Sequence, residues 1–316
     1  MAKKSVPRKG SLQFWPRKRA ARFLPRVNWD AINSGKNLKG FIGYKVGMFS
    51  GYVKDETADS MTKGKKIIIP VTILECPPLK ILSVRFYKNG RVNSEVLSEN
   101  LDKELKRKVK LPKNKSKSVD SVKNEDYDDV KVICYSQVKK TNIKKTPDIL
   151  EIGLSGSKED KIKFIKEKLG KDITISDVFE KGQLADLRGL TKGFGFSGPV
   201  KRFGIRLRQH KSEKGVRRPG SIAPWHPART TFKAPMAGQV GLFTRAIYNN
   251  KIIGIENAEN KKDILKNIKN YGDIKSDYII IRGSIQGPAK RQVVITSPLR
   301  VTRKQLKKNY ELVELR

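Results

Sequence analysis

The chain has 316 residues, and 69 lysines and arginines outnumber 31 aspartates and glutamates, which leaves a formal net charge of +38. A soluble domain with that much unpaired positive charge would repel itself, so the balance predicts a polyanionic partner, with nucleic acid as the first candidate. No apolar run is long enough to span a membrane, and the basic N-terminus lacks the apolar core of a signal peptide, so the sequence argues against both.

The N-terminal segment is basic, aromatic and rich in proline. Between Lys3 and Arg26 nine cations stand without an acid, and Trp15 and two phenylalanines are interleaved among them. Such a segment buries too little apolar surface to fold alone, so we expect residues 1–39 to form an arm that becomes ordered against a partner. A solubilising tail is the plain alternative, but the aromatics among the charges favour the arm.

Strand patterns begin after Gly40 and define the first part of a β-rich core, assigned to residues 40–187. Runs of β-branched and aromatic residues predict strands, and Asn89-Gly90 predicts a tight hairpin turn between two of them. The predicted strands cover residues 41–48, 67–74, 81–87, 130–135, 149–152 and 173–187.

An insertion at about residues 95–170 interrupts these strands. Its first part, residues 95–129, carries a lysine-rich run and then an acidic patch, which predicts a helical or loop segment. Ser157 is spaced from Asp160 as in a helix-capping pair, and apolar residues then recur on one face as far as Gly170. We therefore expect an amphipathic helix over this stretch.

Residues 188–245 lose apolar periodicity and hold thirteen cations against one acid, Glu213. Nine glycines and five prolines interrupt any regular element. A loop of this length is unusual inside a compact domain, but it is expected where the chain leaves the domain and is built into RNA, because glycine lets the backbone approach phosphates. After this extension, residues 246–316 return to the β core, with strands predicted at 252–255, 278–282 and 292–296 and a short helix at 260–271.

The cations and aromatics of the two basic segments are the candidate RNA-binding side chains. Each aromatic taken alone is explained equally well by packing into protein, and His226 by a structural hydrogen bond. As a group they favour RNA, because the neighbouring apolar residues are too sparse to form a separate core. The candidates are Trp15, Arg17, Lys18, Arg19, Arg22, Lys192, Phe194, Phe196, Lys201, Arg202, Arg206, Arg208, Arg217, Arg218, Trp225, His226, Arg229 and Lys233.

Other motifs do not support an enzyme. Residues 193–198 satisfy the GxGxxG pattern, but a dinucleotide fold needs a helix that opens at the third glycine, and Pro199 follows instead. A kinase would need a catalytic loop and a DFG motif, and neither is found. The chain's two cysteines and two histidines are too scattered for a zinc site, so we predict no catalytic residue, no metal and no cofactor. The two cysteines, Cys76 and Cys134, also predict a reducing, cytosolic compartment.

Four sequence blocks, in this order, carry a family resemblance. They are GSLQFWPRKRAA at 10–21, FIGYKVGM at 41–48, TKGFGF at 191–196 and APWHPA at 223–228. With them, most of the chain resembles the universal large-subunit ribosomal protein L-three family, in its archaeal and eukaryotic branch. Residues 95–129 depart from the pattern.

The resemblance implies a mainly β fold: a closed β-barrel of the translation-protein type, an α/β insertion and two basic extensions threaded into large-subunit (23S-type) rRNA. It implies a non-enzymatic, cytoplasmic protein that supports early subunit assembly and touches neighbouring ribosomal proteins. By motif match, Trp225 is the tryptophan of a finger near the aminoacyl-tRNA side of the peptidyl transferase centre. The alternatives are an RNA-modifying enzyme with a cofactor on the glycine motif, and an architectural DNA-binding protein.

Overall fold

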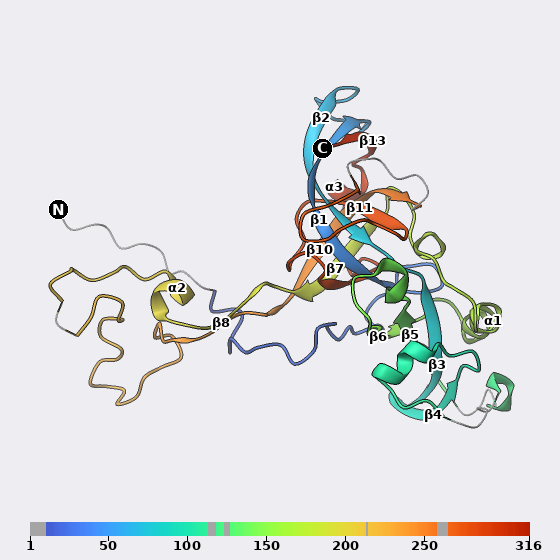
Figure 1. Ribbon diagram of the computed structural model, residues 1–316, viewed down its shortest axis with the longest axis horizontal. Coiled ribbons are helices and arrows are strands. Elements are labelled where there is room, and N and C mark those ends of the chain that lie inside the picture. The colour runs from blue at the N-terminus through green and yellow to red at the C-terminus, as the bar shows by residue number, and fades with distance from the viewer. Residues whose placement is uncertain (1–10, 113–117, 123–126, 213, 258–264) are drawn as a thin grey trace. The chain divides into compact units, whose positions relative to one another are not determined.

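The computed structural model describes residues 11–112, 118–122, 127–212, 214–257 and 265–316 (Figure 1). It is mainly β, as predicted, because strands account for far more of the described residues than helices do. The strands are β1 (Gly40–Asp55), β2 (Lys66–Glu75), β3 (Leu79–Lys88), β4 (Arg91–Leu97), β5 (Asp129–Ser136), β6 (Ile149–Gly153), β7 (Leu184–Leu190), β8 (Gly193–Ser197), β9 (Gly238–Gly241), β10 (Thr244–Glu256), β11 (Tyr278–Arg282), β12 (Gln292–Thr296) and β13 (Tyr310–Leu315). The α-helices are α1 (Lys158–Lys168), α2 (Pro199–Phe203) and α3 (Arg303–Leu306), and short 3-10 turns lie at Lys103–Arg107, Val119–Ser121, Val138–Thr141 and Ile175–Asp177.

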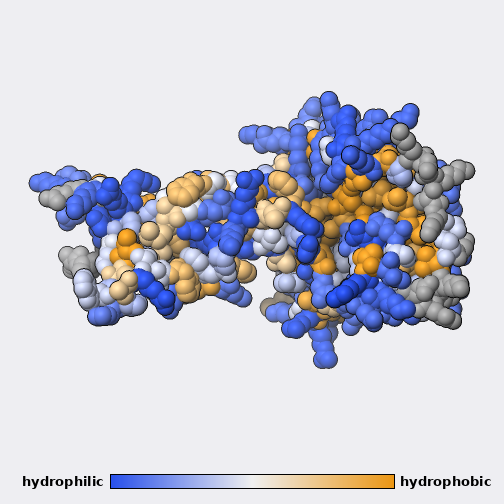
Figure 2. Space-filling view, turned by 90° about the horizontal axis from the view of Figure 1, so that it is seen from below, coloured by the Kyte–Doolittle hydropathy of each residue, from blue (hydrophilic) through white to orange (hydrophobic). Residues whose placement is uncertain are grey.

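Contacts divide the chain into two compact units, and each is described by itself. The larger unit comprises residues 24–189 and 245–316, and the smaller unit comprises residues 11–23 and 190–244. Figure 2 shows apolar side chains gathered on one face of the larger unit, whereas blue and pale colours dominate over the smaller unit. Apolar material is thus concentrated in the larger unit.

A seven-stranded sheet organises the larger unit. Its strand order is β12-β7-β10-β11-β2-β1-β13, and β12 also pairs with β1. This added pairing is antiparallel and aligns Ile42 with Val294. Six strands are therefore hydrogen-bonded, each to the next, in a circuit in which the last pairs with the first: β1, β2, β11, β10, β7 and β12.

A smaller sheet packs against the same core. Its order is β4-β3-β5-β6, and α1 covers β5 with the buried side chains of Phe164 and Ile165. The β3–β4 hairpin turns at Asn89 and Gly90, both at positive φ, as the sequence predicted. Helix α1 begins at the predicted capping box of Ser157 and Asp160.

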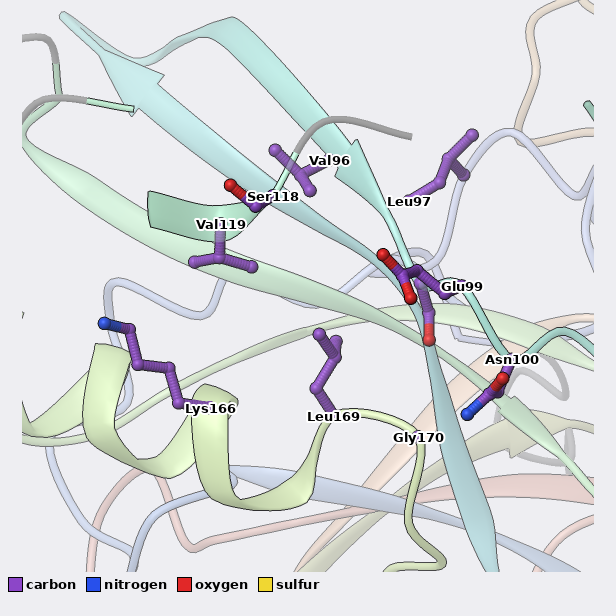
Figure 3. Close-up of a pocket in the computed structure, with 10 residues that line it drawn as sticks. Val96, Leu97, Glu99, Asn100, Ser118, Val119, Lys166, Leu169 and Gly170 are labelled. Atoms are coloured by element: carbon purple, nitrogen blue, oxygen red, sulfur yellow. The ribbon is translucent and has the colours of Figure 1, made fainter. Parts of the chain in front are cut away.

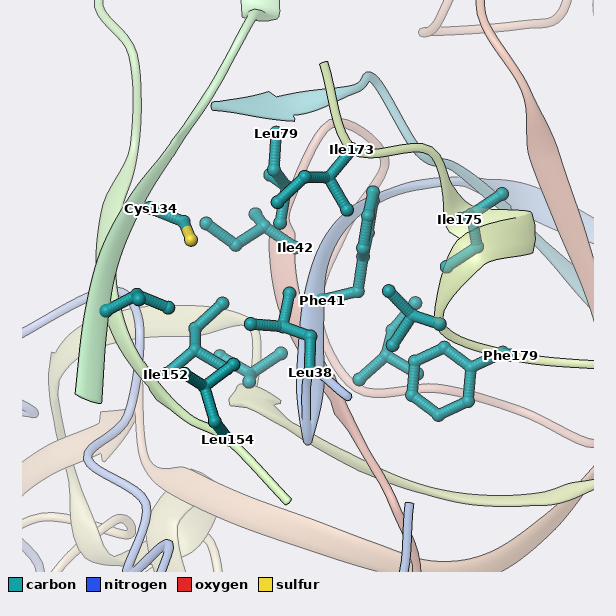
Figure 4. Packing of buried hydrophobic residues seen from close by; sticks show 14 of the residues in the cluster. Leu38, Phe41, Ile42, Leu79, Cys134, Ile152, Leu154, Ile173, Ile175 and Phe179 are labelled. Atoms are coloured by element: carbon teal, nitrogen blue, oxygen red, sulfur yellow. The ribbon is translucent and has the colours of Figure 1, made fainter. Parts of the chain in front are cut away.

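The two sheets share one apolar core. Phe41 and Ile42 of β1 belong to the same buried cluster as Cys134 and Ile152 of the smaller sheet, and Figure 4 shows Ile42 pointing toward Cys134, with the Phe41 ring on the other side of β1. Trp29 is also buried here, against two glycines: a Cβ on Gly40 or Gly153 would lie only 2.7 or 2.6 Å from a Trp29 side-chain atom. Burial of apolar surface at this density is the main stabilising term of the unit.

The predicted strands of the larger unit are confirmed at 41–48, 67–74, 81–87, 130–135, 149–152, 252–255, 278–282 and 292–296. The strand predicted at 173–187 is wrong over its first part. Thr174 and Asp177 form a capping box that starts a 3-10 turn, Gly182 has a positive φ, and the strand begins only at Leu184. Ile173 makes only an isolated bridge to Leu79.

The prediction that residues 188–245 lack regular structure is also wrong in part, because β8, α2 and β9 lie there. In the 95–129 segment, β4 continues to Leu97, and the described remainder forms short 3-10 turns and loop, as predicted. The helix predicted at 260–271 lies partly outside the described residues, and residues 266–271 form a turn closed by a bridge between Ile268 and Gly272. Part of the lysine-rich run and of the acidic patch, at 113–117 and 123–126, lies outside the described residues, as do residues 1–10 of the arm.

Candidate nucleic-acid interface

The cationic extension starts from a two-stranded ribbon. Strand β8 pairs antiparallel with β9, with Ser197 opposite Gly238, and a bulge lies between Gly193 and Gly195. Gly241 has a φ of +71°, and a Cβ there would lie 1.9 Å from the carbonyl oxygen of Lys192, so only glycine fits. The ribbon brings the two ends of the 198–237 segment together.

Three aromatic rings and one guanidinium form a small core in the smaller unit, in which Phe203 is buried, Trp15 is half-buried and Phe232 lies at the edge, 60% exposed. The Trp15 ring stacks on Phe203 at 6.1 Å between centroids, and Phe232 meets Trp15 edge-on at 5.5 Å. The guanidinium of Arg17 lies 4.5 Å from the centroid of Phe203 and 5.3 Å from that of Trp15. Such ring and cation–π contacts each contribute about 0.5–1.5 kcal/mol, so they tie the N-terminal arm to the extension.

Arg202 links the two halves of the extension. Its Nη1 donates to the carbonyl oxygen of Met236 at 2.9 Å, and its Nε donates to that of Gln239 at 3.2 Å. The Arg202 carbonyl oxygen in turn accepts a hydrogen bond from Nη1 of Arg17 at 3.1 Å. Burial lowers the pKa of the Arg202 guanidinium from its ordinary value. Gly238 leaves room for this group, since a Cβ there would lie 2.9 Å from Arg202 Cζ.

Other aromatics of the smaller unit point away from protein. The Trp225 side chain is 87% exposed, and Phe196 on β8 is 80% exposed. Phe194 is also exposed, with the ammonium group of Lys201 4.5 Å from its ring centroid. Large apolar rings in water are unfavourable, so these three mark surfaces suited to a partner that stacks on them.

The predicted binding residues divide into two groups. Trp15, Arg17 and Arg202 are half-buried and engaged inside the smaller unit. The remaining candidates are exposed: Lys18, Arg19, Arg22, Lys192, Phe194, Phe196, Lys201, Arg206, Arg208, Arg217, Arg218, Trp225, His226, Arg229 and Lys233. Sequence reasoning did not foresee the contact of Trp15 with Phe203 and Phe232, and the only signal was the presence of aromatics in both basic segments.

Carboxylates do not neutralise the smaller unit. Glu213 is the only acid in the sequence of residues 1–23 and 190–244, and it lies outside the described residues. Arg208 donates instead to the carbonyl oxygen of Pro219 at 2.6 Å. The cations of this unit therefore have almost no acids to pair with, and glycine and proline keep much of its backbone out of regular secondary structure. Both properties favour binding to successive phosphates of a nucleic acid.

The glycine motif does not adopt a nucleotide-binding geometry. Residues 193–197 form strand β8 of the ribbon, and the following helix α2 has only five residues and begins at Pro199. A dinucleotide site requires a parallel strand followed by a helix that opens at the glycines. A cavity of about 250 Å³ beside α2 is lined by Lys201 and Arg217, without an acid.

A larger cavity, of about 320 Å³, lies between β4 and α1 in the larger unit. Figure 3 shows Val96, Val119 and Leu169 around it, with Lys166 and Glu99 well apart from each other. Its polar groups do not converge on one point, as those of a ligand site do. Within the described ranges there is no group of three or more His, Cys, Asp or Glu side chains that could hold a metal ion.

Buried ionisable groups of the larger unit are engaged in its own structure. The Tyr44 hydroxyl donates to Asp148 at 2.6 Å and shares a hydrogen bond with Ser136 at 2.7 Å, and burial beside Asp148 raises the Tyr44 pKa well above its usual value. Burial raises the pKa of the Cys134 thiol to about 12, so this group stays protonated and unreactive at neutral pH. In the described part of the chain, no helix is long and apolar enough to cross a membrane.

A mainly β core with a cationic, aromatic-bearing extension is typical of a structural protein that binds a polyanion. The family described as "Ribosomal protein L3" matches residues 1–316. The "Large ribosomal subunit protein uL3" of Methanobrevibacter smithii is 40% identical over 96% of this chain and 95% of its own length. The protein of the same name from Methanocaldococcus jannaschii is 40% identical over 93% of this chain and 91% of its own length. That from Picrophilus torridus is 38% identical over 96% of this chain and 94% of its own length. The chain belongs to the ribosomal protein L3 family, as the four sequence blocks predicted.

Proposed function

We propose that this chain is a structural, non-enzymatic component of the large subunit of cytoplasmic ribosomes, where it binds 23S-type rRNA and neighbouring ribosomal proteins. Family membership supports the large subunit as its location. The exposed Trp225, on an extension with thirteen cations and one acid, is the observation that carries the RNA contact. The sequence of this extension offers a single acid, Glu213, so most of these cations have no carboxylate within the extension to compete with phosphate.

The proposed mechanism is preorganisation followed by charge neutralisation. The Trp15–Phe203–Phe232 core and the Arg202 hydrogen bonds hold the extension in shape, so less conformational entropy is lost when RNA binds. Lysines and arginines then displace counterions from phosphates, and each phosphate contact steepens the salt dependence of log K by about 0.7–0.9. Exposed aromatics add stacking on bases, worth about 1–3 kcal/mol each.

The finer assignments belong to the same proposal. The circuit of six strands is proposed to be the closed barrel of the translation-protein type, with the 95–170 region as its α/β insertion. Residues 1–39 and 188–245 are proposed as the two extensions, and 40–187 with 246–316 as the core that carries them. Residues 24–39 are the part of the first extension that packs into this core, where Trp29 and Ile32 are buried. The tip around Trp225 is proposed to reach toward the peptidyl transferase centre, and the whole chain to support early subunit assembly.

Substitution of Trp225 tests this function. Trp225→Ala removes an exposed ring that the folded chain does not use, so the melting temperature of the purified protein should stay unchanged. Ribosomes with the variant should show altered aminoacyl-tRNA accommodation or altered sensitivity to peptidyl-transferase inhibitors. Trp225→Phe, which keeps a stacking ring, is the matched control and should lie close to wild type. Wild-type accommodation and drug sensitivity with Trp225→Ala would contradict the proposal.

A further inference from the structure

The larger unit carries a second cationic stretch, whose lysines and arginines lie on and between strands. Between Asp277 and Glu311 the sequence holds eight lysines and arginines and no acid. Six of these cations lie on β11 and on the segment around α3. They are Arg282, Arg300, Arg303, Lys304, Lys307 and Lys308, called here the carboxyl-terminal cationic surface.

This surface is fastened to the seven-stranded sheet. The Nδ2 of Asn249 on β10 donates to the hydroxyl of Thr302 at 2.9 Å, at the start of α3. The ammonium group of Lys251, also on β10, donates to the carbonyl oxygen of Leu306 at 3.2 Å, at the end of α3. Both ends of the short helix are thus hydrogen-bonded to β10, so the cations are presented on a strand of the sheet.

Carboxylates offset few of these charges among the described residues. Arg300, Arg303, Lys304 and Lys307 are exposed, and among the described residues no acidic oxygen lies within 4.0 Å of their cationic nitrogens. Asp55 acts on Lys308 from nearby, but its carboxylate already accepts hydrogen bonds from the Thr57 backbone at 3.0 Å and from two hydroxyl groups, on Ser60 and Thr62.

The folded chain instead holds like charges together. Burial lowers the pKa of the Lys308 ammonium group, and repulsion from Arg282 and Lys304 lowers it further. The Arg282 guanidinium is kept in place 5.2 Å from the centroid of the Tyr310 ring. Positive groups that repel one another on one surface are unfavourable for folding alone, and a bound polyanion relieves the repulsion.

The residues around the carboxyl-terminal cationic surface indicate whether it would contact the backbone or the bases of a nucleic acid. Val301 and Leu306 are about half exposed between the cations, and Tyr248 on β10 is exposed nearby. With a single exposed ring, the surface offers less for base stacking than the extension does. Cations with interspersed apolar groups suit the ribose–phosphate backbone of folded RNA, which is recognised by shape and by phosphate contacts.

We propose that the carboxyl-terminal cationic surface is a second RNA-binding site, which contacts the backbone of a folded rRNA segment separate from the one bound by the extension. The identity of the polyanion as rRNA rests on the proposed function. The charges, the lack of a carboxylate partner for the four exposed cations among the described residues, and the hydrogen bonds from β10 stand independently of it.

Neutralisation of the exposed cations tests the proposal. The variant Arg300→Gln, Arg303→Gln, Lys304→Gln and Lys307→Gln removes four positive charges in the full-length chain. A matched control, Lys103→Gln, Lys106→Gln, Arg107→Gln and Lys110→Gln, removes four exposed positive charges elsewhere in the larger unit. Binding to large-subunit rRNA is measured as a function of salt, with hydroxyl-radical footprinting of the same complexes and a melting curve for each protein.

The surface variant should fold at least as well as wild type, because it relieves repulsion. It should bind on the order of tenfold more weakly at moderate salt and lower the salt slope by about 2–4, beyond the change in the control. It should also lose one group of protected nucleotides, while Arg217→Gln with Arg218→Gln loses a different group. If the surface variant has the same affinity and the same footprint as the control variant, the proposal of a second RNA-binding site is wrong. A footprint unaffected by either variant would instead overturn the proposed function.

Discussion

The two units keep their shapes by different means. In the larger unit, strands such as β1 bury nearly every inward side chain, and one apolar core joins both sheets. In the smaller unit, a few rings, one buried arginine and a glycine-bearing ribbon hold a long cationic segment. The comparison indicates that the larger unit is stabilised mainly by burial of apolar side chains, whereas the smaller unit depends on a few specific contacts.

Removal of the extension should have the largest effect on function and almost none on the larger unit. Ser197 and Gly238 are register partners, so an Asn-Gly turn can replace residues 198–237 without opening the ribbon. We expect the shortened chain to melt as wild type does and to fail completely to support subunit assembly or growth. The measurements are a calorimetric melting curve and complementation of a depleted strain. Collapse of the shortened chain would show that the core extends into the removed segment.

Disruption of the shared core should have the next largest effect. Phe41 is fully buried, so Phe41→Ala leaves a cavity and should lower the free energy of unfolding by about 3–5 kcal/mol. Denaturant titration followed by tryptophan fluorescence measures the loss. Phe194→Ala, which removes an exposed ring of the same size, is the control and should change stability by less than about 0.5 kcal/mol. If Phe41→Ala and Phe194→Ala lowered the free energy of unfolding equally, the two units would not differ in how their side chains stabilise them.

Disruption of the small core should have a smaller and local effect. Trp15 is half-buried and stacks on Phe203, so Trp15→Ala should destabilise the smaller unit by about 1–3 kcal/mol. We expect faster proteolytic cleavage within residues 205–235 and an unchanged melting transition of the larger unit. Trp15→Phe keeps a ring and loses no hydrogen bond, because the buried indole N–H has no acceptor among the described residues, so it should cleave as wild type does. Slow cleavage of Trp15→Ala would contradict the role of this core.

Sequence patterns predicted the larger unit well because its strands bury alternating or continuous β-branched residues. Strand β8 was not predicted, since it has only five residues, two of them glycines, which are depleted in strands, and its two phenylalanines are exposed. Strand β13 and helix α3 were also not predicted, because exposed charges interrupt their apolar pattern. Circuit closure through β12 and β1 depends on residues about 250 positions apart, which local patterns do not report.

The candidate site was predicted in outline and not in its internal contacts. Charge and glycine content predicted the extension, and Trp225 was selected as an aromatic within it and by motif match. The same signals assigned Arg17 and Arg202 to RNA, whereas their guanidinium groups contact rings and carbonyl oxygens of the chain itself. These contacts of Arg17 and Arg202 depend on the geometry of the β8–β9 ribbon. The number of cations in the sequence does not show which of them contact protein and which would contact phosphate. The carboxyl-terminal cations were missed because they lie among strands.

The most direct test of the account is a structure of the large ribosomal subunit that contains this chain. We predict that rRNA encloses residues 205–235, with phosphates beside the exposed cations and the Trp225 ring against RNA, while the core around Phe41 remains free of RNA. A subunit in which residues 205–235 face solvent or only protein would contradict the central claim that RNA is the partner of this segment.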